Sequence, residues 1–174
     1  KTYNTSKKER IYHMFGFSKK KNLKEDSHLY APLSGEIISI SEVADPVFSK
    51  KMMGDGYAVE PTGNQLFAPV SAKVSLVQGH ALGFVRADGL EVLLHVGIDT
   101  VSLNGAPFTF KVKEGDIVDG GQEIGHVDWD QVKKAGLSQT TMIVFTNTQD
   151  KLGNFEVKKG TTTAGADIGS AQVK

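Results

Sequence analysis

Short apolar or alternating runs, broken by glycine, proline, aspartate and asparagine, are the feature that most constrains the fold of this chain. Its 174 residues include 19 glycines, and from Leu29 onward almost no segment keeps the periodicity of an amphipathic helix. Many short strands with turn signals between them are typical of a sandwich or a barrel-like sheet. The sequence therefore predicts an all-β fold, an antiparallel β-sandwich or barrel-like sheet.

Ten strands and one short helix are expected. The helix covers residues 130–135, with Asp128 or Asp130 as its N-cap and Gly136 at its end. The segments 31–37 and 68–74 share the pattern Ala-Pro-x-Ser, which either an internal duplication or a common turn preference explains. The strands are expected at residues 35–41, 56–60, 65–68, 72–76, 80–86, 90–96, 108–112, 123–127, 141–146 and 154–158.

The length and composition fit one globular domain with tails. With 39% apolar residues, the chain can bury a substantial core, and we expect the domain at residues 29–174. Residues 1–28 are polar and basic, which predicts a poorly ordered extension. Met14 resembles a natural start, so residues 1–13 are interpreted as non-native, and this start favours a free-standing protein over the alternative of a domain cut from a longer transporter.

Charge and cysteine content exclude several functional classes. Lys plus Arg equals Asp plus Glu at 20 each, so no global charge favours nucleic acid or an anionic membrane. The absence of cysteine excludes disulfides and thiol nucleophiles and suits a reducing compartment. No apolar stretch reaches a membrane span of roughly 18 residues, and no secretory segment is evident. The expected location is cytoplasmic.

Two histidines, His80 and His95, flank a hairpin signal at Asp88-Gly89. A two-residue turn at that dipeptide makes facing residue numbers sum to 177, so His95 faces Leu82 and His80 faces Gly97. The two imidazoles then become diagonal neighbours on one face of one sheet. A three-residue loop with a bulge would shift this register and could separate the rings.

A lone histidine in an apolar strand is usually a core residue. Here the pair, the nearby carboxylate of Asp99 and two adjacent glycines, Gly79 and Gly97, favour a functional site. A glycine beside an imidazole lets a phosphate or a bulky partner approach the backbone closely.

Several chemistries could use a histidine pair. His95 and Asp99 have a spacing that some zinc peptidases use, but a zinc site needs a third protein ligand, and His13, His28 and His126 form no His-x-His pair. A zinc ion shared with a partner's carboxylate stays open. The motifs of serine hydrolases and of nucleotide-binding loops are absent from the sequence.

Nucleophilic histidine chemistry remains. A neutral imidazole nitrogen can attack a phosphoryl group and hold it as a phosphoramidate. The acceptor ring needs a fixed tautomer, and hydrogen-bond donors must neutralise the phosphoryl oxygens. A second imidazole and a glycine-rich backbone can supply such donors.

The residues around the pair resemble the glucose-type IIA component of the bacterial phosphoenolpyruvate-dependent sugar phosphotransferase system. The resemblance covers roughly residues 29–159 and fades in both tails. The matching segments are 79–81, 88–101 with the motif Leu-Leu-His-Val-Gly-Ile-Asp-Thr, 103–105, Phe108, 31–35, 45–48, 54–56, 61–64 and 68–70.

This resemblance implies a phosphoryl carrier for sugar uptake that works without a metal or organic cofactor. His95 would be phosphorylated on Nε2, with its Nδ1 donating to the carbonyl of Gly97, and His80 would donate to the phosphoryl oxygens. Phosphate would arrive from a histidine phosphocarrier protein and leave to a cysteine on a IIB domain. Regulated transporters or kinases are further candidate partners, and nucleic acid is not expected.

The resemblance also implies an apolar docking ring around the site. Val47, Phe48 and Val96 would form part of the ring, and Asp45 and Asp99 would meet an arginine of the donor protein.

One departure from the family pattern concerns Gln78, which stands where many members have a threonine that orients the auxiliary histidine, so the rate of transfer is in question.

The alternative function is that of a regulatory binding module whose phosphorylation modulates a transporter or an enzyme without onward transfer.

Overall fold

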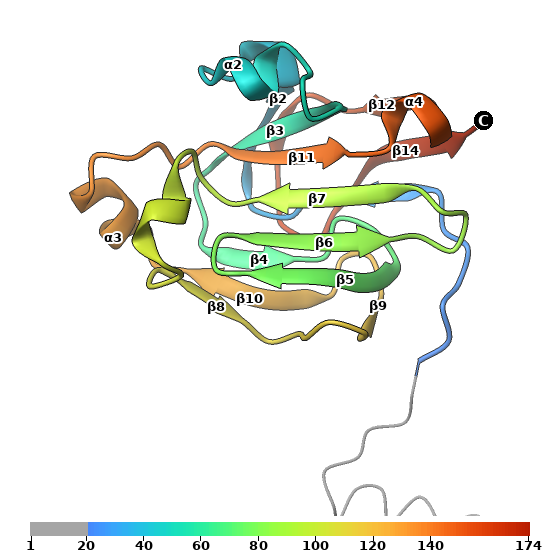
Figure 1. Cartoon of the computed structure of the whole chain (residues 1–174), viewed down its shortest axis with the longest axis horizontal. Coiled ribbons are helices and arrows are strands. Elements are labelled where there is room, and N and C mark those ends of the chain that lie inside the picture. The colour runs from blue at the N-terminus through green and yellow to red at the C-terminus, as the bar shows by residue number, and fades with distance from the viewer. Residues whose placement is uncertain (1–20) are drawn as a thin grey trace, which may run out of the picture.

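The computed structural model describes residues 21–174 and shows antiparallel β-sheets packed on one another (Figure 1). The largest sheet has eight strands, in the order β13 (Gly160–Thr162), β2 (Gly35–Ser39), β3 (Asp55–Pro61), β11 (Thr141–Phe145), β7 (Glu91–His95), β6 (Ala81–Val85), β5 (Ala72–Gln78) and β9 (Ile117–Val118). All its neighbouring strands pair antiparallel. The prediction of an antiparallel all-β fold is confirmed.

Two three-stranded sheets complete the sandwich. One has the order β1 (His28–Tyr30), β14 (Asp167–Val173) and β12 (Leu152–Val157), and the other the order β4 (Gln65–Phe67), β10 (Glu123–Val127) and β8 (Phe108–Phe110). The helices are short: η1 (Ile40–Glu42), α2 (Pro46–Ser49), η2 (Thr100–Leu103), α3 (Trp129–Lys134) and α4 (Thr148–Lys151).

The predicted helix is α3. The carboxylate of Asp128 accepts from the backbone N–H of Asp130 at 3.1 Å, so Asp128 is the N-cap. Gly136 follows the helix with a φ of +73°, a conformation that glycine adopts without strain. Four strands escaped the sequence analysis, namely β1, β9, β13 and β14, and each is short or contains glycine.

Two apolar clusters stabilise the fold. The larger one lies between the sheets and contains inward-facing residues such as Tyr57, Leu94 and Ile143. The smaller one covers the opposite face of the eight-stranded sheet with residues of η1, α2 and strands β3 and β11, namely Ile40, Val43, Phe48, Ala58, Ile98, Met142 and Val144. His95 pairs with Met142 across β7 and β11, so it lies on this second face.

The two Ala-Pro-x-Ser segments occupy equivalent positions. The N–H of Tyr30 donates to Pro69 and the N–H of Phe67 donates to Pro32, both at 2.9 Å. The equivalence extends to the two serine hydroxyls, which accept from backbone N–H groups at 2.9 and 2.8 Å, and to the two alanines, each of which exchanges a pair of backbone hydrogen bonds with a later segment. The repeat in the sequence therefore marks two equivalent crossings of the chain, as a duplicated β unit would produce.

The hairpin between β6 and β7 has a different register from the one predicted. His95 pairs with Ala81 rather than Leu82, so facing residue numbers sum to 176. The loop has three residues, because Arg86 and Leu90 still pair through a backbone hydrogen bond of 3.0 Å and Gly89 takes a φ of +90°. The carboxylate of Asp88 accepts from the side chain of Arg86 and from the N–H of Leu90, which stabilises this loop.

The predicted extension falls largely on residues 1–20, which lie outside the described residues. Within the described part, Asp26 accepts from the hydroxyls of Tyr30 at 2.9 Å and Ser71 at 2.7 Å, and β1 begins at His28. The amine of Lys21 also donates to Asp119 at 3.2 Å and to Gln122 at 2.7 Å, so the chain contacts the sandwich from Lys21 onward.

Replacing Asp88 with asparagine should destabilise the protein. The Arg86 side chain is 2% exposed and is held by Asp88 and by the carbonyl of Ala171 at 3.0 Å. Loss of the counter-charge leaves a buried guanidinium unpaired, which costs about 3–5 kcal/mol of unfolding free energy. Urea denaturation measures the change, with the exposed Glu114→Gln as the matched control; equal stability of the two variants would contradict the account.

Candidate active site

Two histidine rings meet at one end of the sandwich. His95 ends β7, and His80 lies in the turn between β5 and β6, with ring centroids 4.7 Å apart and planes at 72°. Alternation within β6 would have placed His80 on the other face in the observed register. The rings meet because His80 stands just before the strand, where the turn reverses the chain. The predicted proximity is confirmed, although the register that led to it was wrong.

The tautomer of His95 is set by one hydrogen bond. Its Nδ1 lies 2.8 Å from the carbonyl oxygen of Gly97, and a carbonyl can only accept. Nδ1 therefore carries the proton, and Nε2 carries the lone pair. Gly97 has a φ of +77°, which brings its carbonyl back toward the ring two residues earlier. The ring of Phe48, 5.1 Å away by centroids, packs beside the imidazole.

The surroundings keep both rings neutral at pH 7. Burial lowers the pKa of His95, and the neighbouring His80 lowers it further, against smaller opposing effects of the Gly97 carbonyl and the carboxylates of Asp45 and Asp99. Burial also lowers the pKa of His80. A neutral imidazole with a free Nε2 lone pair is the nucleophilic form of histidine.

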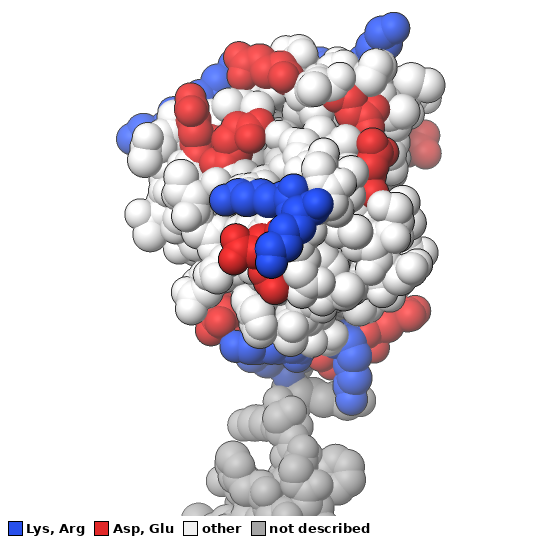
Figure 2. All heavy atoms as spheres, turned by 90° about the vertical axis from the view of Figure 1, so that its left-hand side faces the viewer, with Lys and Arg blue, Asp and Glu red and all other residues white. Residues whose placement is uncertain are grey.

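Both predicted carboxylates line one crevice and act electrostatically on His95. Asp45 caps α2, since one of its oxygens accepts from the N–H of Val47 at 2.9 Å. Asp99 is exposed and has a left-handed backbone with a φ of +60°. Figure 2 shows the end of the molecule at which α3 lies: acidic side chains lie over its upper part and beside two basic side chains at its centre, with uncharged side chains around them. The crevice is lined by residues 44–47, 98, 99 and 136–138.

The predicted apolar ring is only partly correct. Phe48 is 5% exposed and Val96 is fully buried, because the first packs in the smaller core cluster and against His95 and the second lies in the larger one. Val47 is 40% exposed, as expected. The sequence analysis missed Met52 and Val101, which are 71% and 62% exposed and follow α2 and Asp99 in the chain. Their signal was an apolar side chain within an otherwise polar turn.

Gln78 ends β5 beside His80 and is exposed. No hydrogen bond joins their side chains in the described part of the chain, so Gln78 does not take over the orienting role of that threonine in this structure. Burial, rather than an orienting side chain, is the effect that sets the pKa of His80.

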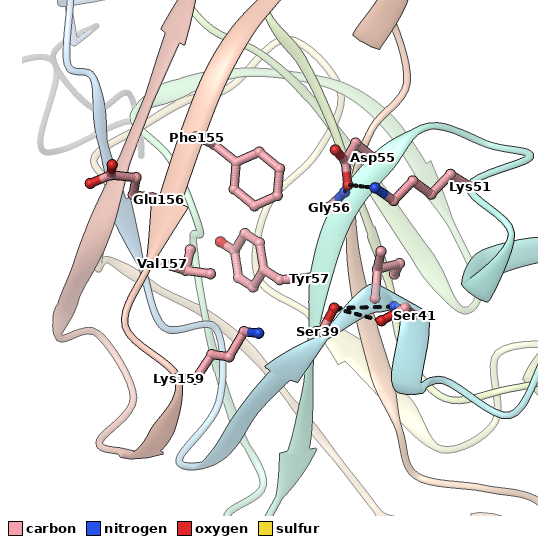
Figure 3. Close-up of a pocket in the computed structure, with 11 residues that line it drawn as sticks. Ser39, Ser41, Lys51, Asp55, Gly56, Tyr57, Phe155, Glu156, Val157 and Lys159 are labelled. Carbon is pink, nitrogen blue, oxygen red and sulfur yellow. Dashed lines mark hydrogen bonds and ion pairs between the residues drawn. The ribbon is translucent and has the colours of Figure 1, made fainter.

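A second hollow lies away from the histidines, between β3 and β12 (Figure 3). Its polar groups are largely engaged with each other: Lys51 pairs with Asp55 at 3.4 Å, and the hydroxyls of Ser39 and Ser41 lie 2.9 Å apart. The hydroxyl of Tyr57 is buried without a partner, and burial raises its pKa. None of these groups offers a free nucleophile, so the histidine pair is the better candidate for catalysis.

Two further properties concern residues 21–174. No group of three or more histidine, cysteine, aspartate or glutamate side chains there is arranged to hold a metal ion. None of the helices in this range is both long enough and apolar enough to cross a bilayer.

The chain is similar to known proteins. The family model of the phosphoenolpyruvate-dependent sugar phosphotransferase system, EIIA 1, matches residues 27–151. A glucose-specific EIICBA component of this system from Streptococcus pneumoniae serotype 4 is 46% identical over 129 residues, which are 73% of this chain and 18% of that protein. The solved structure of glucose permease IIA from Mycoplasma capricolum matches with a TM-score of 0.77 and 36% identity, over 86% of this chain and 97% of that one.

The fold and the site together define an antiparallel β-sandwich protein with a paired-histidine centre at one end. The chain belongs to the EIIA 1 family of the phosphoenolpyruvate-dependent sugar phosphotransferase system. The resemblance read from the sequence is thereby confirmed. The chain spans about a fifth of the length of its pneumococcal relative.

Replacing His80 with glutamine should raise the pKa of His95 toward the ordinary value of about 6.5, because the repulsion between the rings is lost. An NMR titration of the His95 ring measures this. The exposed His126→Gln on β10 is the matched control and should leave the His95 pKa unchanged.

The lowered pKa of His95 also makes the stability of the folded protein depend on pH. Because the folded state resists protonation of His95, the unfolded state binds protons first, and unfolding free energy falls as pH drops below about 6.5. His80→Gln should reduce this loss. A His95 pKa that stays the same or falls in the variant would contradict the electrostatic account.

Proposed function

We propose that this chain is a phosphoryl carrier for sugar uptake, with Nε2 of His95 as the acceptor. The observation that carries the proposal is the hydrogen bond from Nδ1 of His95 to Gly97, beside a second imidazole. Phosphate comes from a phosphorylated histidine phosphocarrier protein and goes to a cysteine of a IIB domain. The chain has no cysteine of its own, so the final thiol belongs to another domain or protein.

The transfer balances without a cofactor. The Nε2 lone pair of His95 forms a bond to phosphorus while the bond from phosphorus to the donor's ring nitrogen breaks, and the electron pair returns to the donor ring. The proton on Nδ1 stays in place, and the Gly97 carbonyl stabilises the positive charge that develops on the His95 ring. His80 lies within reach to donate a hydrogen bond to the phosphoryl oxygens.

The surface near His95 suits a protein partner. Val47, Met52 and Val101 expose apolar side chains on the segments that flank the site, and such patches favour docking. Asp45 and Asp99 place negative charge beside them, which suits an arginine of the donor. We place the reaction in the cytoplasm, a reducing compartment that suits a chain without cysteine.

Replacing His95 with glutamine should abolish phosphate acceptance, since the amide keeps the polarity of the side chain but lacks a nucleophilic nitrogen. Incubation with the phosphorylated donor, followed by detection of acid-labile phosphate, measures the effect. His126→Gln serves as the control and should accept normally. A stable, acid-labile phosphate on the His95→Gln protein would refute the acceptor assignment.

Replacing His80 with glutamine should leave acceptance possible and slow delivery to a IIB domain by a factor of about 10² to 10³, the usual effect of removing one oxyanion donor. The measurement follows transfer from the phosphorylated variant to a purified IIB domain of a glucose permease. An unchanged delivery rate would remove the auxiliary role of His80. Acceptance without any delivery by the parent protein would instead identify a regulatory module.

A further inference from the structure

One short stretch of backbone touches both histidines. The N–H of Val96 donates to the carbonyl of His80 at 2.9 Å, and the carbonyl of Gly97, one residue on, accepts from Nδ1 of His95 at 2.8 Å. A rotation of the first peptide group would disturb the backbone of His80, and a rotation of the second would break the hydrogen bond to the His95 ring. Whatever holds this stretch also sets the geometry of the site.

The side chain of Thr100 anchors this stretch of backbone. Thr100 is fully buried, and its hydroxyl donates to the carbonyl of Val96 at 2.5 Å. Its methyl group fills the space next to Gly97, where an added Cβ would come within 2.5 Å of the Thr100 Cγ2 atom. The hydroxyl thus fixes one peptide group, and the methyl group limits the movement of the next.

The remaining anchor of this stretch is a backbone contact. The N–H of Ile98 donates to the carbonyl of Ser138 at 3.1 Å, which holds the peptide group whose carbonyl accepts the hydrogen bond from Nδ1 of His95. Ser138 is itself held through Thr140, whose hydroxyl accepts from Ser138 at 3.0 Å and donates to Glu60 at 2.6 Å. Thr100 contributes a side-chain hydrogen bond to the preceding peptide group, at the carbonyl of Val96.

We propose that Thr100 is a positioning residue for the phosphoryl acceptor: its hydroxyl, bonded to Val96, keeps the Gly97 carbonyl aimed at Nδ1 of His95 and so keeps the Nε2 lone pair available. The inference rests on the proposed function for its effect on rate. Its structural part, the control of the His95 tautomer, stands independently. Thr100 touches neither the reacting nitrogen nor the phosphoryl group, so it acts through the backbone alone.

Two substitutions separate the hydroxyl from the methyl group. Thr100→Val keeps the shape and removes the donor, whereas Thr100→Ser keeps the donor and removes the methyl group. Nitrogen-15 NMR of the imidazole rings reports the tautomer of His95, and a rapid-quench assay with the phosphorylated donor reports the rate of acceptance. Thermal unfolding of each variant shows whether the fold is retained.

Thr100→Val should increase the population of the His95 tautomer with hydrogen on Nε2 and slow acceptance about tenfold or more, since a small misplacement of a reacting group has effects of this size. Thr100→Ser should restore most of the rate and the parent tautomer. A folded Thr100→Val protein with the parent tautomer and rate overturns the proposal. Equal loss in both variants also overturns it, because packing would then be the cause.

Failure of the two proposals can be told apart. If the parent protein accepts no phosphate, the proposed function fails, while the tautomer measurement, which needs no donor, still tests Thr100. If Thr100→Val does not fold, exchange of the Thr100 hydroxyl proton in the parent protein decides, with the exposed Ser102 hydroxyl as the reference. Slow exchange supports the anchoring bond, and exchange as fast as that of Ser102 overturns it.

Discussion

The hydrogen bond between Nδ1 of His95 and the carbonyl of Gly97 is the interaction on which the site depends. It selects one tautomer and leaves Nε2 as the free nitrogen, and in the proposed transfer it would offer a partner for the positive charge on the ring. Burial of the ring keeps it neutral, so the nucleophile needs no separate base. A loop with a left-handed glycine is thus as important to the chemistry as the histidine itself.

The β-sandwich makes such a loop possible. Strand β7 lies in the middle of the eight-stranded sheet, between β11 and β6, so the backbone of His95 is held from both sides. The two equivalent crossings at the Ala-Pro-x-Ser segments are held by backbone hydrogen bonds of their own. The site itself lies at strand ends and turns, where the backbone is free to take the positive φ values of Gly97 and Asp99.

Much of the fold could be read from the sequence, since alternation and turn residues report strands directly. Strands β9 and β13 are too short to show alternation, and the hairpin register escaped because the buried Arg86 draws Asp88 into a longer loop. The proximity of the histidines was predicted, but the burial of Phe48 and Val96 was not. Exposure of an apolar side chain near a loop depends on tertiary packing, which local sequence does not encode.

The measurement that tests the account most directly is the position of the phosphorus atom after reaction with the phosphorylated donor. Coupling between phosphorus-31 and nitrogen-15 in the labelled protein identifies the bonded nitrogen, and residue-specific assignment identifies the ring. The account predicts one phosphohistidine, bonded through Nε2 of His95, with the proton retained on Nδ1. Phosphorus on Nδ1 of that ring, or on His80, would contradict it.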